Sequence, residues 1–249
     1  MALDITNGQK KRAQKVVIYG AEGIGKSTLA SKFPDPLFID LEGGTSQLDV
    51  KRIDSIQSWK ELGATLGEIF KTNGICKTLV IDTADAAENL AREHYKEDKG
   101  MEYEAVPYGV GYAEFAQLVA ALISTLDLLI KKGINVVVLA HAQIRKFEQP
   151  DELGAYDRWE LKLSKKTAPL FKEWADMLLF CNYKANVAVN EKTGKAKASG
   201  GKRVIYAQHS ASYDAKNRHD LPDMFDMDYE FLKPIFEEVK ENGKTDVAR

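Results

Sequence analysis

Six short runs of apolar and β-branched residues recur along the chain, and longer segments with helical spacing lie between them. The runs cover residues 15–19, 37–42, 77–83, 134–140, 176–183 and 203–207. Runs that are apolar at consecutive positions are typical of strands buried on both faces of a sheet. The pattern therefore predicts a buried, mostly parallel sheet.

Apolar residues recur every three or four positions in the segments between these runs. The predicted helices are 27–33, 58–71, 84–97, 112–132, 167–174 and 228–241. Pro34 and Pro36 end the first helix, and Gly133 ends the fourth. Strands that alternate with helices predict an α/β fold, a twisted sheet with helices on both faces.

Three connecting segments lack a regular pattern. Residues 98–112 are rich in glycine and tyrosine and predict a mobile loop, and residues 144–167 predict a long, irregular, charged loop. Residues 184–200 predict a lysine-rich hairpin with its turn at 190–195. A long loop within a compact domain is usually functional or disordered, so these segments are candidates for ligand contact.

The segment 20–27 reads GAEGIGKS and matches the phosphate-binding pattern G-x-x-x-x-G-K-[ST], between a predicted strand and a predicted helix. Glycines let successive backbone N–H groups point at phosphate oxygens. Lys26 is expected to reach the β- and γ-phosphates, and the Ser27 hydroxyl is expected to bind Mg²⁺. The predicted nucleotide-binding residues are Gly20, Ala21, Glu22, Gly23, Ile24, Gly25, Lys26, Ser27 and Thr28.

Two acidic residues follow predicted strands, where ligands bind in this fold class. Glu42 is placed to accept a proton from, or to orient, the water that attacks the γ-phosphate. Asp82 is expected to bind Mg²⁺ through water or to meet the Ser27 hydroxyl. Asp85 is a candidate cap of the next helix. Past the run 134–140, either His141 or Gln143 is placed to sense the γ-phosphate.

Composition and charge limit the classes of protein to which the chain can belong. The chain has 249 residues, 44% of them hydrophobic and 29% charged, with a net charge of −2, so any nucleic-acid contact must come from local patches. Cys76 and Cys181 both lie in apolar surroundings and predict reduced core thiols of a cytosolic protein. No apolar run reaches eighteen residues and no signal-peptide pattern is present, so we expect no membrane span and a cytoplasmic location.

Basic and aromatic residues alternate in 144–167, and this pattern suits single-stranded nucleic acid, although acidic residues are also present. The tyrosines of 98–112 are placed either to stack on bases or to pack on protein. The lysines of 184–200 belong either to a nucleic-acid contact or to a soluble hairpin tip. Residues 1–14 carry a basic cluster, and residues 221–249 are predominantly acidic.

The order of these motifs resembles the RecA-type P-loop ATPase core, and more closely the phage RecA-like nucleotide-binding proteins of the single-strand-annealing group. It begins with the phosphate loop and continues with the strands that end at Glu42, Asp82 and His141. The resemblance spans roughly residues 14–220. It implies a RecA-like ATPase domain at 15–220, and the charge pattern adds a polar arm at 1–14 and an acidic helix or tail at 221–249.

The resemblance also implies roles. ATP and Mg²⁺ are the expected cofactors, Glu42 activates water, and Gln143 or His141 couples ATP to DNA. Lys216 and Arg218 match a Lys-x-Arg pair that reaches the nucleotide of a neighbouring subunit. The implied function is DNA-stimulated ATP hydrolysis on single-stranded DNA in phage recombination, annealing or replication. The implied setting is the bacterial host cytoplasm, in a ring or filament, with a single-strand-binding protein as a further candidate partner.

Three other functions remain open at this stage. In a small-molecule kinase, the segment 144–166 would be a lid that closes on a second substrate. A nucleotide-switched scaffold would bind ATP with negligible turnover. A helicase loader or hexameric translocase would share the ATPase core.

Overall fold

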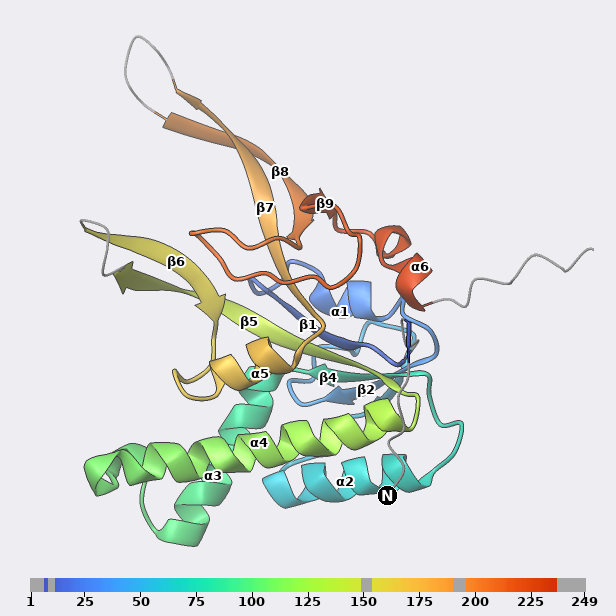
Figure 1. Ribbon diagram of the computed structural model, residues 1–249, viewed down its shortest axis with the longest axis vertical. Coiled ribbons are helices and arrows are strands. Elements are labelled where there is room, and N and C mark those ends of the chain that lie inside the picture. The colour runs from blue at the N-terminus through green and yellow to red at the C-terminus, as the bar shows by residue number, and fades with distance from the viewer. Residues whose placement is uncertain (1–6, 9–11, 149–153, 190–195, 237–249) are drawn as a thin grey trace, which may run out of the picture.

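In a computed structural model, the chain forms a nine-stranded sheet with helices on both faces (Figure 1). The structure describes residues 7–8, 12–148, 154–189 and 196–236. The strands are β1 (Lys15–Gly20), β2 (Pro36–Asp40), β3 (Lys51–Ile53), β4 (Thr78–Asp82), β5 (Asn135–Glu148), β6 (Ala155–Leu161), β7 (Met177–Val189), β8 (Ala196–Tyr206) and β9 (Met224–Asp226). The helices are α1 (Lys26–Ala30), α2 (Trp59–Lys71), α3 (Ala84–Lys99), α4 (Val110–Lys131), α5 (Ala168–Trp174) and α6 (Lys233–Phe236), with short 3₁₀ turns η1 (Tyr103–Ala105), η2 (Pro107–Gly109) and η3 (Tyr229–Phe231).

The strand order is β3-β2-β4-β5-β1-β7-β8-β9, and the strands from β3 to β7 are all parallel. β8 and β9 continue the sheet in antiparallel pairing, and β6 pairs with the far half of β5. β5 therefore lies between β1, which leads into the phosphate loop, and β4, which ends at Asp82. Parallel strands place their carboxyl ends at one edge, so residues 20–27, Glu42, Asp82 and His141 gather there.

Each face of the sheet has its own core. Alternate residues of β1 point to opposite faces: Val17 and Tyr19 pack with α2, α3, α4 and α5, whereas Val16 and Ile18 pack with α1 and the C-terminal turn η3. Figure 1 shows the three long helices on one side of the sheet and α1 and α6 on the other. The predicted fold class, an α/β fold with a mostly parallel sheet and helices on both faces, is confirmed. The buried, unpaired Cys76 and Cys181 match the prediction of core thiols.

The helix α4 is the longest of the described helices. With the preceding turn, Pro107–Lys131 is long and apolar enough, by length and composition alone, to cross a membrane. Its inner face is nevertheless packed on the sheet and its neighbours, through Phe115, Val119, Leu122 and Leu126. The hydrophobicity of α4 is thus accounted for by the core that it covers.

Two predictions about loops are wrong. The segment 144–167 is not irregular, because β5 continues to Glu148 and pairs with β6 as an antiparallel hairpin, from Ala142 opposite Leu161 to Glu148 opposite Ala155. In the segment 98–112, for which a mobile loop was predicted, the structure has short 3₁₀ turns. These are η1 and η2, and the ring of Tyr103 is buried and stacked on Phe115 with centroids 4.2 Å apart.

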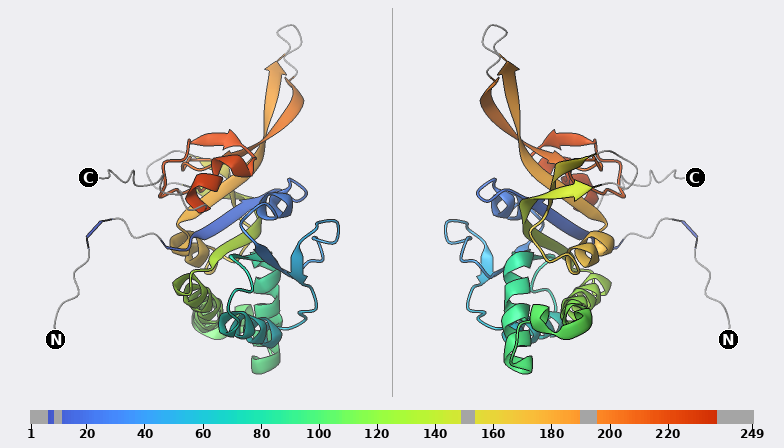
Figure 2. Two further views of the ribbon diagram at one scale, coloured as in Figure 1. Left: turned by 90° about the vertical axis from the view of Figure 1, so that its right-hand side faces the viewer. Right: turned by 90° about the vertical axis from the view of Figure 1, so that its left-hand side faces the viewer.

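The hairpin of β7 and β8 agrees with the prediction for 184–200, although both strands are longer than expected. It projects beyond the body of the molecule in all views (Figures 1 and 2). Its predicted turn at 190–195 lies outside the described residues, as do Lys10 and Lys11 of the basic arm. The helix predicted over 228–241 is only partly correct: it starts as the 3₁₀ turn η3 and is described to Phe236, whose ring packs against Phe33 after α1.

Candidate functional site

The phosphate loop leaves β1 at Gly20 and enters α1 at Lys26. Gly20 is required by the sheet, because a Cβ atom there would lie 2.3 Å from the carbonyl oxygen of Cys181 on β7. Gly23 and Gly25 adopt left-handed φ angles of 71° and 104°, which favour glycine. The loop therefore has the curled backbone that its sequence predicts.

The side chain of Lys26 lies across this loop. Its Nζ donates hydrogen bonds to the carbonyl oxygens of Gly20 at 3.1 Å and Ala21 at 3.0 Å. Burial lowers the pKa of Lys26, and the nearby thiol of Cys181 and the carboxylate of Asp82 oppose that change. The two carbonyl partners are neutral, so the positive charge of Lys26 remains available to a phosphate oxygen.

Ser27 and Asp82 meet as predicted. The Ser27 hydroxyl donates to Oδ2 of Asp82 at 2.6 Å, across 55 residues of sequence. Burial raises the pKa of Asp82, the Ser27 hydrogen bond opposes this rise, and the charges of Glu42 and Asp40 add to it. A hydroxyl and a buried carboxylate are oxygen ligands of the kind that Mg²⁺ prefers, so the pair fits the expected metal ion.

Glu42 is held by contacts on both sides of it. Asp40, at the end of β2, accepts hydrogen bonds from Gly44 N–H at 3.1 Å, Thr45 N–H at 2.9 Å and the Thr45 hydroxyl at 2.6 Å. These bonds close a tight turn around Glu42. Oε1 of Glu42 in turn accepts a bond of 2.7 Å from the hydroxyl of Thr83, whose peptide bond with Asp82 is cis.

His141 forms a close pair with Asp85. Nδ1 of His141 lies 2.5 Å from Oδ1 of Asp85 and 3.7 Å from Oε1 of Glu42, and the His141 N–H donates to Asp85 Oδ2 at 3.2 Å. Asp85 is therefore not the helix cap that was expected. Thr83 caps α3 by accepting from Ala86 N–H, which leaves Asp85 to hold the imidazole.

An open cavity of about 510 Å³ adjoins the phosphate loop at this edge of the sheet. Its lining is mostly acidic: Glu22, Glu42, Asp85, Glu88, Asn89, His141 and Lys162. Lys162, just after β6, pairs with Glu22 of the phosphate loop at 3.2 Å. Gln143 is not among these lining residues, because its amide donates to the carbonyl of Leu161 within the β5–β6 hairpin.

Lys216 and Arg218 lie at the opposite edge of the sheet from the phosphate loop of their own chain. Nζ of Lys216 donates to the carbonyls of Lys172 at 2.6 Å and Glu173 at 3.2 Å. Arg218 pairs with Asp176 at 2.9 Å, beside the first residues of β1 and β7. Within one chain, the structure does not bring these two residues to the site.

The comparisons with known proteins bear on the whole domain. A family model described as an AAA domain matches residues 12–219. The chain belongs to this AAA domain family. It is an AAA-type P-loop ATPase, and the match contains every predicted site residue from Gly20 to Arg218.

Two further similarities are weaker. The chain is 24% identical over 153 residues to the SPbeta prophage-derived uncharacterized protein YorG of Bacillus subtilis (strain 168), covering 57% of this chain and 47% of that one. It thus spans about half the length of that relative. The KaiC-like protein PH0186 of the hyperthermophilic archaeon Pyrococcus horikoshii OT3 superposes with a TM-score of 0.46 and 14% identity, covering 84% of this chain and 83% of that one.

The role of Asp85 in this AAA domain was missed from the sequence. The available signal was that Thr83 already supplies a cap for α3, so that the acid in its first turn has no capping task. Its partner was not visible, because Asp85 and His141 are 56 residues apart and meet only through the pairing of β4 with β5.

Proposed function

We propose that this AAA domain hydrolyses ATP with Mg²⁺ and couples hydrolysis to single-stranded DNA, as an oligomer, in phage recombination, annealing or replication. The observation that carries the ATPase part is the meeting of Lys26, Ser27, Asp82, Glu42 and His141 at one edge of the sheet. These groups come from four separate segments of the chain, and together they supply the parts that phosphoryl transfer requires.

The chain's own groups would act in the following way. Backbone N–H groups of the loop and the Lys26 ammonium bind the phosphates, and Lys26 exchanges its two carbonyl partners for phosphate oxygens. Ser27 and Asp82 would hold Mg²⁺, which would supply positive charge to the triphosphate. Glu42 orients the attacking water and accepts its proton, since the Thr83 hydroxyl fixes one of its oxygens.

Between the two candidate sensors we favour His141. It lines the cavity with Glu42, whereas the side-chain amide of Gln143 is engaged with Leu161. Asp85 engages Nδ1, and no hydrogen bond of the described residues engages Nε2, so an Nε2–H would be able to donate to a γ-phosphate oxygen. His141 also lies on β5, the strand that runs on into the β5–β6 hairpin, so a shift at His141 has a direct route to that hairpin.

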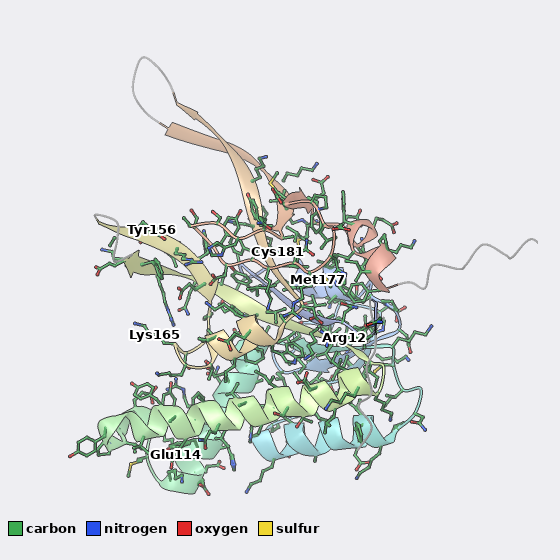
Figure 3. All side chains as sticks on the ribbon, in the orientation of Figure 1. Arg12, Glu114, Tyr156, Lys165, Met177 and Cys181 are labelled. Atoms are coloured by element: carbon green, nitrogen blue, oxygen red, sulfur yellow. The ribbon has the colours of Figure 1, made fainter. Side chains whose placement is uncertain are left out.

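The DNA part of the proposal rests on the β5–β6 hairpin and the loop that follows it. Figure 3 shows Tyr156 on β6 and Lys165 in the following loop. Lys146, Lys165 and Lys166 are exposed there and are available to phosphates, whereas Lys162 pairs with Glu22. Arg158 is not available, because it is buried and pairs with Asp214 at 2.5 Å. The prophage origin of YorG supports the phage setting.

The same contacts weigh against a kinase lid. A lid that closes on a second substrate needs free arginines, but Arg145 donates to the carbonyl of Leu163 and Arg158 is bound to Asp214. The lysines that remain are point charges suited to a backbone of phosphates rather than to bidentate recognition.

The test is the rate of ATP hydrolysis with and without single-stranded DNA, for the wild type and Lys26→Ala. We expect DNA to raise the wild-type rate, and we expect Lys26→Ala to abolish turnover because the phosphate-binding cation is lost. Phosphate transfer only to an added small acceptor would instead identify a kinase. Tight ATP binding without turnover, with or without DNA, would identify a nucleotide switch.

A further inference from the structure

Arg203 reaches the phosphate loop of its own chain from β8, which is two strands away from β1 in the sheet. It lies on β8, opposite Tyr183 of β7, and β7 in turn pairs with β1. Nη1 of Arg203 donates to the carbonyl oxygen of Ile24 at 3.3 Å, and a Cβ atom placed on Gly25 would lie 2.7 Å from it. The guanidinium therefore rests directly against the last two residues before Lys26.

This guanidinium has no acidic partner among the described residues. The neighbouring Lys202 pairs with Asp226 at 2.6 Å, whereas the described ion pairs include none with Arg203. Arg203 is exposed, and among the described residues its side chain donates a hydrogen bond to the neutral carbonyl of Ile24. A guanidinium in this state keeps most of its donors free for an anion.

The position of the other groups indicates which part of a nucleotide Arg203 would meet. Ser27–Asp82, Glu42 and His141 mark the β4–β5 side of the loop as the place of Mg²⁺ and the γ-phosphate. A triphosphate that followed the loop from there would bring its α-phosphate and nucleoside toward β7 and β8, the side where Arg203 lies. The cavity on the γ-phosphate side is mostly acidic, so a cation at the other end also balances the charge of the site.

We propose that Arg203 is a nucleotide-binding residue that contacts the α-phosphate in cis. The proposal rests on the proposed binding of ATP at the phosphate loop. It differs from the role of Arg218, which would act on the nucleotide of a neighbouring subunit. Gly25 fits this arrangement, because any side chain there would push the guanidinium off the loop.

The experiment measures the affinities of Mg²⁺–ATP, Mg²⁺–ADP and Mg²⁺–GTP by calorimetry for the wild type, Arg203→Ala, Arg203→Lys and Lys202→Ala. We expect Arg203→Ala to weaken ATP and ADP binding equally, by about 10- to 100-fold, as for loss of one charged hydrogen bond. Arg203→Lys should recover much of this loss because the charge is kept. Lys202→Ala, on the adjacent position, should bind both nucleotides like the wild type.

Three results would overturn the inference while leaving the proposed ATPase intact. The first is wild-type affinity in Arg203→Ala. The second is a loss of affinity confined to ATP, which would indicate a contact with the γ-phosphate. The third is a failure of Arg203→Lys to recover binding together with a changed preference between ATP and GTP, which would indicate a contact with the base. A wild-type protein that binds neither nucleotide would instead reject the proposed function itself.

Discussion

At the scale of single residues, the site is built on buried charges that hold one another in place. Asp85 lies 2.5 Å from Nδ1 of His141 and also accepts from the His141 backbone N–H. Two contacts to one carboxylate fix both the backbone of β5 at His141 and the ring of that residue. The imidazole is thereby oriented before any nucleotide binds, which reduces the reorganisation required during the reaction.

Replacing this carboxylate by an amide tests its role. We expect Asp85→Asn to reduce ATP turnover by at least about tenfold with little change in ATP affinity, because the carboxylate that positions the His141 ring is lost while the phosphate loop is untouched. Steady-state turnover and calorimetric ATP binding provide the two measurements. The control is Asn89→Ala, because Asn89 lines the same cavity. Equal turnover in the two variants would contradict this role.

Sequence motifs predicted the contacts that depend on chain order, and missed those that depend on strand pairing. The contact of Ser27 with Asp82 was predicted because a phosphate loop followed by an apolar strand ending in an acid implies it. Asp85 and Arg203 were missed as site residues, since their partners are determined by which strands are neighbours in the sheet. The choice between His141 and Gln143 likewise needed the position of Leu161 on β6.

At the scale of elements, α4 shows how a single helix can be apolar for reasons of packing. Leu126 is fully buried against the sheet, whereas Leu128, two residues further on, is 46% exposed. Residues two positions apart in a helix face in different directions, so this pair separates the packed face from the open one.

The two leucines provide a matched test of this assignment. We expect Leu126→Ala to lower the free energy of unfolding by roughly 2–5 kcal/mol, because it leaves a cavity in the core. Leu128→Ala should change it by no more than about 0.5 kcal/mol. Urea denaturation followed by circular dichroism measures both. Similar losses for both variants would show that α4 does not present its predicted inner face to the core.

The helices were predicted more accurately from the sequence than the strands of the β5–β6 hairpin. The periodicity of α2, α3 and α4 is strong because each has one buried face, and their predicted limits differ from the structure by at most two residues. The distal half of β5 and all of β6 carry charges of both signs. Much of this β5–β6 hairpin extends away from the core, so charged side chains are tolerated there. A strand without a continuous buried face lacks the hydrophobic pattern by which strands are recognised.

At the scale of the whole molecule, the phosphate loop and the pair Lys216 and Arg218 occupy opposite edges of one sheet. A subunit with this layout can bind a nucleotide at one edge and offer cations from the other. Arg218 is more than half exposed even though it pairs with Asp176, and Asp176 keeps Arg12 as a second partner at 2.7 Å. Arg218 can therefore leave Asp176 without leaving that acid unpaired.

Mixing two inactive variants tests the sharing of sites between subunits. We expect Lys26→Ala and Arg218→Ala each to lose most ATP turnover alone. We expect the mixture to regain activity, because a Lys26→Ala subunit can supply Arg218 to an intact phosphate loop on its neighbour. The rate of phosphate release is measured across mixing ratios. Full activity of Arg218→Ala alone, or no recovery on mixing, would contradict the shared site.

The contact between Gly20 and β7 has a consequence for how relatives of this protein diverge. A side chain at position 20 collides with the Cys181 carbonyl whether or not a nucleotide is bound, whereas position 23 faces open space. A relative that no longer bound nucleotides would keep Gly20, because the sheet requires it. Gly23 could be substituted in that relative at the modest cost of a strained backbone. Degenerate copies are therefore better detected by the loss of Gly23 and Lys26 than by any change at Gly20.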